Sequence, residues 1–130
     1  MNAPCSCGRV DARGRVLAWD ACCGRYLDGD TPAPDAESLM RSRYSAFAHN
    51  RADYLFATWH PGTRPAELVL EPGVKWLGLD VKAHRVIDTD HAEVEFVARS
   101  RVNGRGQRLH ERSRFVLQDG RWLYVDGDMQ

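Results

Sequence analysis

Apolar residues recur at helical spacing over residues 36 to 49 of the chain. Asp35 precedes this segment and suits the N-cap position, because its carboxylate can accept a hydrogen bond from a free backbone N–H of the first turn. A second, shorter helix is expected from about residue 52 to Trp59, since Pro61 pushes the preceding His60 out of the helical region. The pattern predicts two consecutive helices, with apolar positions Leu39, Met40, Tyr44, Phe47 and Ala48 in the first and Tyr54, Leu55 and Trp59 in the second.

Beyond Gly73 the apolar residues alternate with polar ones, which is typical of half-buried strands. Further runs at 94–98, 109–117 and 122–125 are separated by turn-forming sequences at 88–91, 103–106 and 118–121. Asp119-Gly120 has the signature of a two-residue hairpin. Helices followed by a four-stranded antiparallel meander predict an α+β fold, with helices packed on one curved sheet. Its first strand is expected to carry one face made by Leu77, Leu79, Val81 and Ala83, with Trp76 and Gly78 on the other.

Length and composition narrow the class of protein. The chain has 130 residues, of which 43% are hydrophobic and 28% charged, and this suits one ordinary globular domain with a small appendage. Lys and Arg total 18, as do Asp and Glu, so the usual electrostatic basis for nucleic-acid binding is missing and no sequence-specific DNA binding is expected. The N-terminus lacks the features of a secretory signal, and no apolar run approaches the ~20 residues of a membrane span. We therefore expect a soluble, cytoplasmic protein.

All four cysteines lie within the first 23 residues, as two close pairs: Cys5 with Cys7, and Cys22 with Cys23. Residues 1–30 otherwise contain few periodic apolar positions, which indicates a loop-built module that needs a staple. The stiff stretch 31–34, with two prolines, separates this module from the remaining domain, residues 31–130. We therefore expect two units with a boundary at residue 30.

Two thiolate pairs joined by a loop can supply the tetrahedral ligand set that structural Zn²⁺ prefers. Gly8 and Gly24 follow the two pairs and are expected to let the backbone turn tightly around the ion. Disulfide bonds are the less favoured alternative, because the cytoplasm is reducing. Free thiols or another thiophilic metal, such as an iron–sulfur centre, also stay open. The favoured prediction is a structural zinc site with ligands Cys5, Cys7, Cys22 and Cys23.

Residues 4–29, from Pro-Cys-Ser-Cys-Gly to Cys-Cys-Gly-Arg-Tyr-Leu-Asp-Gly, resemble the zinc-binding SEC-C motif of the SecA translocation ATPase. The segments 39–47, 58–61 and 120–127 are similar to the bacterial YchJ family, and the similarity extends over nearly the whole chain. This resemblance implies a cone-shaped, nuclear-transport-factor-two-like (cystatin-like) domain behind the zinc knuckle. It also implies a metal-binding protein with a binding or adapter role toward a protein or ribonucleoprotein partner.

One face of the expected sheet carries polar groups among apolar ones. The hairpin registers place Glu111, Ser113 and Asp126 on that face, which is concave in a cone-shaped fold, and Arg41 or Arg43 of the first helix could reach it. The alternative function is therefore a small-molecule-binding protein or an enzyme that uses this pocket. In the simpler interpretation, Glu111 pairs with one of the arginines and only holds helix to sheet.

Other polar residues give weaker indications. His60 and His110 could each act in acid–base chemistry, but the first could simply cap a helix and the second faces away from Glu111. Five aromatic residues are expected to pack in the core and not to serve as stacking platforms: Trp59, Trp76, Trp122, Tyr44 and Tyr124. Six arginines concentrate on one hairpin and could contact RNA or an acidic surface, or form a solvated face; they are Arg99, Arg101, Arg105, Arg108, Arg112 and Arg114.

Overall fold

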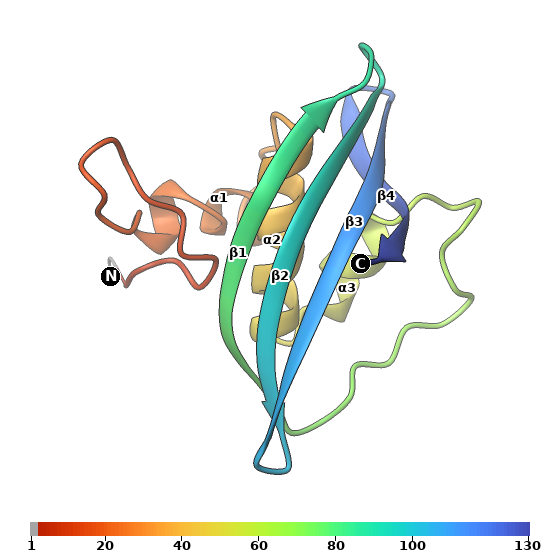
Figure 1. Ribbon diagram of the computed structural model, residues 1–130. Helices are drawn as coiled ribbons and strands as arrows, with labels where there is room; N and C mark the ends of the chain where they lie inside the picture. The colour runs from red at the N-terminus through yellow and green to blue at the C-terminus, as the bar shows by residue number, and fades with distance from the viewer. Residues whose placement is uncertain (1–2) are drawn as a thin grey trace.

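The computed structural model describes residues 3–130 and has its helices before its strands (Figure 1). The elements are a short 3₁₀ turn (Trp19–Ala21), α1 (Gly24–Leu27), α2 (Ala36–Ala48), α3 (Ala52–Ala57), β1 (Val74–Val86), β2 (His91–Val102), β3 (Arg105–Gln118) and β4 (Arg121–Met129). The strands form one antiparallel sheet in the order β1-β2-β3-β4. The predicted α+β class is confirmed.

Both predicted helices form, and the first begins where its local signal places it. The Asp35 carboxylate accepts a hydrogen bond from the Ser38 backbone N–H at 2.7 Å and so caps α2. Helix α3 ends at Ala57, before the expected Trp59, because the chain there joins β4 instead. The His60 N–H donates to the Tyr124 carbonyl, and the Tyr124 N–H donates to the Thr58 carbonyl, each at 2.8 Å. These two bonds tie the end of α3 to the last strand.

Two-residue turns connect the last three strands. Asn103 and Gly104 have φ values of 52° and 78°, and Asp119 and Gly120 have 53° and 77°. Both pairs therefore occupy the left-handed region that a tight hairpin turn requires, and that Asn, Asp and Gly tolerate best. The turns fix the register, so that Phe96 lies opposite Glu111.

Two β-bulges change which residues of β1 face the core. Irregularities between Trp76 and Gly78 and between Val81 and Ala83 shift the register of β1. As a result Trp76 packs on the apolar cluster together with Leu79 and Val81, while Leu77 is exposed. The prediction that Leu77 and Ala83 share the buried face is wrong, because each bulge inserts a residue and reverses the alternation.

A third irregularity, between Arg114 and Phe115, shifts the end of β4. Phe115 lies opposite Tyr124, whereas Asp126 lies opposite Arg114 and Ser113 lies opposite Gly127. The prediction that Asp126 shares a face of the sheet with Glu111 and Ser113 is therefore wrong. The extra residue turns Asp126 to the other face of the sheet.

Helices α2 and α3 lie together behind the sheet, and the N-terminal segment lies beyond its β1 edge (Figure 1). One apolar cluster runs from the four buried cysteines through Leu39 and Met40 of α2 to Phe115 of β3. The core is thus continuous across residue 30, and α2 is its central element. Within residues 3–130, every helix is too short or too polar to cross a bilayer.

Candidate metal centre and adjoining cavity

The four cysteine side chains meet at one buried point. Their exposed fractions are 1% to 4%, and all four sulfur atoms lie within 4.8 Å of one another. The Cys5 and Cys7 sulfurs are 3.6 Å apart, and those of Cys7 and Cys22 are 3.7 Å apart. Such distances are too long for a disulfide bond, which is about 2.05 Å. No disulfide bond therefore joins any two of these cysteines.

Short-range backbone bonds bring each pair of thiols to this point. The Cys5 N–H donates to the Leu17 carbonyl at 2.8 Å, which closes the loop that begins after Cys7. Cys22 follows the 3₁₀ turn and donates its N–H to the Trp19 carbonyl at 3.1 Å, and Cys23 begins the turn that becomes α1. The two pairs therefore approach each other from a closed loop and from a helix start.

The two glycines that follow the cysteine pairs serve different purposes. Gly8 has φ 74°, in the left-handed region, as expected for a tight turn. Gly24 has no such backbone angle; instead, a Cβ there would lie 2.7 Å from the side chain and the carbonyl oxygen of Trp19. Gly24 is thus needed for a close approach of Trp19.

The sulfur geometry suits a tetrahedral metal ion. Four ligands at ~2.3 Å from a central Zn²⁺ stand about 3.8 Å from one another, close to the separations of the Cys5–Cys7 and Cys7–Cys22 sulfurs. The four side chains therefore need little movement to hold such an ion.

The thiols perturb one another in this confined space. The pKa of Cys5 is lowered because Cys22, Cys23 and Cys7 can donate hydrogen bonds to its thiolate. The pKa of Cys23 is raised, because its thiol gives its hydrogen bond to Cys22 and the other cysteines and because it is buried. One thiolate is thus stabilised while further negative charge is opposed. A divalent cation relieves this conflict, since it compensates the charge of each thiolate that it binds.

One face of α2 borders the cysteine cluster through hydroxyl groups. The Ser6 hydroxyl donates to Ser45 at 2.8 Å and lies 3.3 Å from His49 Nε2. The Ser45 hydroxyl is itself 3.9 Å from the Cys5 sulfur. Because Ser6 lies between two of the cysteines in sequence, these contacts join the cluster directly to the helix.

Arginine side chains extend the same contact along α2. Arg9 donates to the Ser38 hydroxyl at 2.9 Å. Arg41 donates to the Cys7 carbonyl at 3.3 Å and forms an ion pair with Glu37 at 2.8 Å. Arg41 therefore faces the cysteines, and the expectation that it reaches the concave face of the sheet is wrong.

A cavity of about 270 Å³ lies between the opposite face of α2 and the concave face of the sheet. Its lining is mostly apolar and aromatic, with a few polar groups gathered on one side. Helix α2 contributes Met40, Arg43, Tyr44 and Phe47; the connection after α3 contributes Trp59; and the strands contribute Trp76, Phe96, Ala98, Leu109, Glu111, Ser113, Phe115 and Tyr124.

Arg43 is a buried cation in the wall of this cavity, only 6% exposed. Its Nη1 donates to the Leu55 carbonyl at 2.9 Å and to the Thr58 hydroxyl at 2.7 Å. The guanidinium carbon lies 5.2 Å from the ring centre of Trp59 and 4.6 Å from that of Tyr124. Burial lowers the pKa of Arg43 to about 10, so the side chain is charged at neutral pH.

Glu111 stands in the same wall and accepts hydrogen bonds instead of pairing with a cation. Ser113 and Tyr124 both donate to its Oε2 atom, the latter at 3.2 Å. Burial and the nearby carboxylate raise the pKa of Tyr124, which keeps its hydroxyl protonated as a donor. In residues 3–130 no cation lies within 4.0 Å of Glu111, so the simpler interpretation, an ion pair between Glu111 and an arginine, is wrong.

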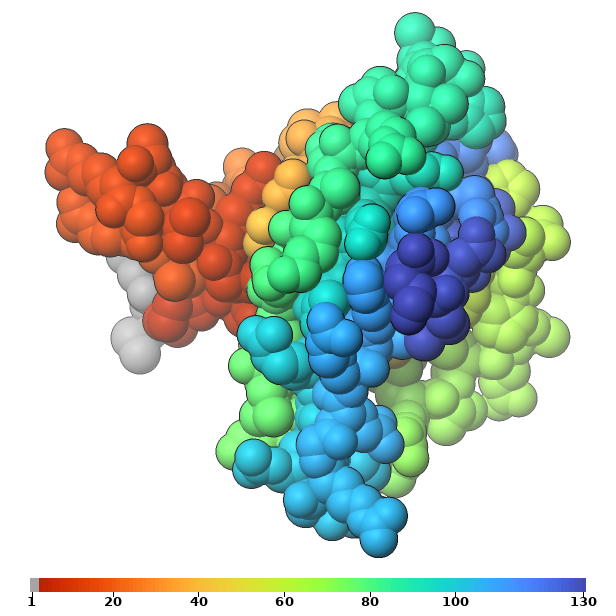
Figure 2. Space-filling model, in the orientation of Figure 1, coloured from red at the N-terminus to blue at the C-terminus, as the bar shows by residue number. Residues whose placement is uncertain are grey.

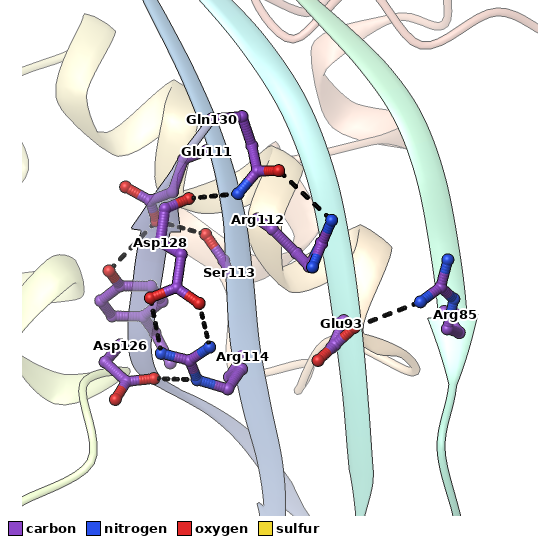
Figure 3. A network of polar contacts seen from close by, with 10 residues as sticks. Arg85, Glu93, Glu111, Arg112, Ser113, Arg114, Asp126, Asp128 and Gln130 are labelled. Atoms are coloured by element: carbon purple, nitrogen blue, oxygen red, sulfur yellow. Dashed lines mark hydrogen bonds and ion pairs between the residues drawn. The ribbon is translucent and has the colours of Figure 1, made fainter.

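Asp126 is placed outside the cavity, on the outer face of the sheet. Figure 3 shows Arg114 between Asp126 and Asp128, with Gln130 joining Asp128 to Arg112. Arg114 lies 2.7 Å from Asp128. Asp126 is therefore part of a surface ion network. The prediction that it lies in the pocket with Ser113 is wrong, because the third bulge turns it to the outer face of the sheet.

The two histidines of interest are both engaged elsewhere. His60 Nε2 lies 3.1 Å from the Gln118 side chain, and its Nδ1 accepts the Gly62 N–H at 2.9 Å. His110 lies 2.7 Å from Glu95 on the outer face, away from the cavity as expected.

Sequence reasoning missed the aromatic side chains as walls of the cavity. Trp59, Trp76 and Tyr124 pack on the core, but they also border the empty volume. The hairpin register of the last two strands puts Tyr124 opposite Phe115. From that register Tyr124 could have been placed near Glu111. Nothing in the pattern marked the β1 bulge that turns Trp76 inward.

Comparisons with known proteins agree with this architecture. Residues 35–127 match the family model described as YchJ, middle NTF2-like domain. The UPF0225 protein of Polaromonas naphthalenivorans is 63% identical over 134 aligned residues, which cover 98% of each chain. A UPF0225 protein of Cupriavidus pinatubonensis is 54% identical and covers 97% of this chain and 88% of its own length.

Two solved structures have the same overall fold. The solution structure of a SEC-C motif containing protein from Rhodopseudomonas palustris superposes with a TM-score of 0.81 at 32% identity, over 97% of this chain and 98% of the other. The crystal structure of a SEC-C motif containing protein from Psychrobacter arcticus gives 0.78 at 29% identity, over 100% of this chain and 83% of the other. The predicted nuclear-transport-factor-two-like fold is confirmed.

Proposed function

Because this chain belongs to the YchJ family and gathers four buried thiols at one point, we propose that it is a zinc-binding protein with a binding or adapter role. The observation that carries the proposal is the cluster of four sulfurs within 4.8 Å of one another. Cys5, Cys7, Cys22 and Cys23 would be the ligands. Residues 1–30 would then form the metal module and residues 31–130 the nuclear-transport-factor-two-like domain.

A structural role for the metal fits this ligand set. Zinc would supply fixed bonds that hold two loop segments together, and four thiolates leave no open position for a substrate or an activated water. With four thiolates and one dication the centre would carry a charge of about −2. The Arg41 guanidinium, hydrogen-bonded to the Cys7 carbonyl, stands where it would partly balance that charge.

The proposed partner surface is the projecting loop that the metal would hold. In Figure 2 the N-terminal segment stands out from the body of the molecule. Val10 and Val16 pair across this loop and are 51% and 46% exposed. Apolar side chains on a protruding, stapled loop favour docking to a protein. A ribonucleoprotein surface is the other candidate, because Arg99 and Arg108 face each other across β2 and β3.

Metal analysis of the purified protein tests the zinc site. We expect one equivalent of zinc per chain and four thiols that react with a thiol reagent only after chelation. Less than about half an equivalent, together with four freely titrating thiols, would contradict the proposal. Bound iron with visible charge-transfer absorption would assign the site to an iron–sulfur centre instead.

Affinity recovery from a lysate tests the adapter role. The bait is used as metal-loaded protein, as chelated protein, and as the Val16→Asp variant, which keeps all four cysteines. We expect specific partners with the loaded wild type that are lost with the other two baits. Identical partners in all three, or none, would count against docking through this loop.

A further inference from the structure

The cavity between α2 and the sheet has a polar end and an apolar end. At the polar end the Arg43 guanidinium lies 4.6 Å from the ring centre of Tyr124, whose hydroxyl donates to Glu111 at 3.2 Å. Ser113, only 2% exposed, completes this group. At the other end Phe47 and Trp76 pack with ring centres 5.6 Å apart. A ligand that fills the cavity must therefore have an apolar body and a polar head.

The polar end of the cavity carries two charged side chains of opposite sign, Arg43 and Glu111. Arg43 is held in place by two hydrogen bonds from one nitrogen, which leaves its other nitrogens to donate. Glu111 receives both of its hydrogen bonds on one oxygen, which leaves the other oxygen to accept. An anionic head would be attracted by Arg43 but repelled by the Glu111 carboxylate. A cationic head would be attracted by Glu111 but repelled by Arg43. A neutral head that both donates and accepts suits both groups.

We propose that this cavity is a binding site for a small, uncharged aromatic molecule whose single head group donates a hydrogen bond to Glu111 and accepts one from Arg43. The site is separate from the cysteine cluster and does not depend on the proposed metal function. Aromatic walls favour a planar body, which can stack or meet ring edges.

The size of the cavity sets the size of the ligand. An apolar cavity of about 150 Å³ holds one benzene molecule. At about 270 Å³ this cavity has space for a ring with a head group or for a fused pair of rings, and it is too small for a nucleotide.

A charge series of one-ring probes tests the proposal on the full-length, metal-loaded protein. Benzamide, benzoate and benzylammonium have the same ring and differ mainly in the charge of the head. Binding is followed by amide chemical shifts of β3 and β4 during titration. We expect saturable binding with benzamide the tightest of the three. Absence of saturable shifts for all three, or tighter binding of either ion, would overturn the proposal.

Two substitutions distinguish binding in the cavity from nonspecific binding elsewhere on the protein. Glu111→Gln leaves Arg43 unopposed, so benzoate should gain about tenfold and become the preferred probe. The matched control is Glu95→Gln, which makes the same change on the outer face, where Glu95 contacts His110, and should leave the order of the probes unchanged. An unaltered preference in the first variant, or the same shift in both, would refute the assigned role of Glu111.

A filled cavity provides an independent readout. Ala98 lines the cavity and is 3% exposed, so Ala98→Leu should occupy part of the volume and abolish benzamide binding while the thermal unfolding transition persists. If that variant is unfolded, Gly127→Ala replaces it. A Cβ at Gly127 would collide with the Glu111 carboxylate and displace it, so benzamide binding should weaken about tenfold. Undiminished binding in a folded variant of either kind places the probe elsewhere and overturns the site.

Discussion

Removal of the proposed metal is expected to destabilise α2 as well as the cysteine loop. The contacts that link the N-terminal segment to this helix include three hydrogen bonds that involve only nitrogen and oxygen atoms: Arg9 to Ser38 at 2.9 Å, Ser6 to Ser45 at 2.8 Å, and Arg41 to the Cys7 carbonyl at 3.3 Å. The segment has only short helical turns and isolated bridges of its own. Without a staple we expect it to detach, and these bonds are then lost.

The size of the effect follows from those contacts. Each hydrogen bond contributes about 1 kcal/mol net, so their loss lowers the free energy of unfolding by about 3 kcal/mol. For a domain of this length, such a change lowers the unfolding midpoint by roughly 10 °C. The pairing of the Trp19 and His49 rings, whose centres are 4.7 Å apart, adds to this loss.

The assay is amide hydrogen exchange by mass spectrometry, combined with thermal unfolding, on loaded and chelated protein. Peptides from α2 should lose protection together with residues 3–30, and Cys22→Ser should reproduce the change without further response to chelator. If residues 3–30 exchange freely while α2 and the unfolding midpoint stay unchanged, the coupling is refuted. That result would make the N-terminal module independent, with the boundary at residue 30.

Two further predictions concern packing and pH. Gly24→Ala should lower the free energy of unfolding by about 1–3 kcal/mol in urea, because its Cβ meets Trp19, whereas Gly106→Ala, where no atom lies within 4 Å, should change it little; equal losses would contradict the steric reason. Arg114 holds the pKa of the Asp128 carboxyl below its usual value. This pair therefore stabilises the fold at pH values above the unfolded-state pKa of Asp128, and the stabilisation is lost as the pH falls through the lower folded-state pKa. Asp128→Asn should therefore flatten the fall of the urea midpoint between about pH 5 and pH 2, and an unchanged slope would refute this contribution.

Signals confined to a few residues were sufficient for the helices and turns. The Asp35 cap and the Asp119-Gly120 turn act through neighbouring backbone groups, so their outcome depends little on the rest of the chain. The β2–β3 register followed from the same logic, since the turn at Asn103 and Gly104 fixes which positions face each other.

Bulges escaped prediction because tertiary contacts decide them. The irregularity beside Trp76 lets its ring reach Tyr44 and Phe47 of α2, each with ring centres 5.6 Å away. The one beside Arg114 aligns this side chain with Asp126 and the residues beyond it. Period-two alternation assumes an uninterrupted ladder, and a sequence pattern does not show where a distant partner makes an interruption favourable.

The sequence predicts one part of the candidate sites, the cysteine cluster, but does not decide which arginine lies in the cavity. The cysteines could be assigned to one cluster because their ligand chemistry limits the alternatives, and their side chains do meet. The sequence pattern offers both Arg41 and Arg43 for the pocket, although positions two residues apart in a helix are separated by about 200° and cannot face the same side. Only the packed structure shows which one faces the sheet.

Helix α2 stands between the two candidate sites and presents opposite faces to them. Ser38, Arg41, Ser45 and His49 follow the helical repeat on the side of the cysteines, whereas the cavity side carries Met40, Arg43, Tyr44 and Phe47. Because a packed helix moves as a unit, it cannot shift at the cysteines without displacing the cavity wall.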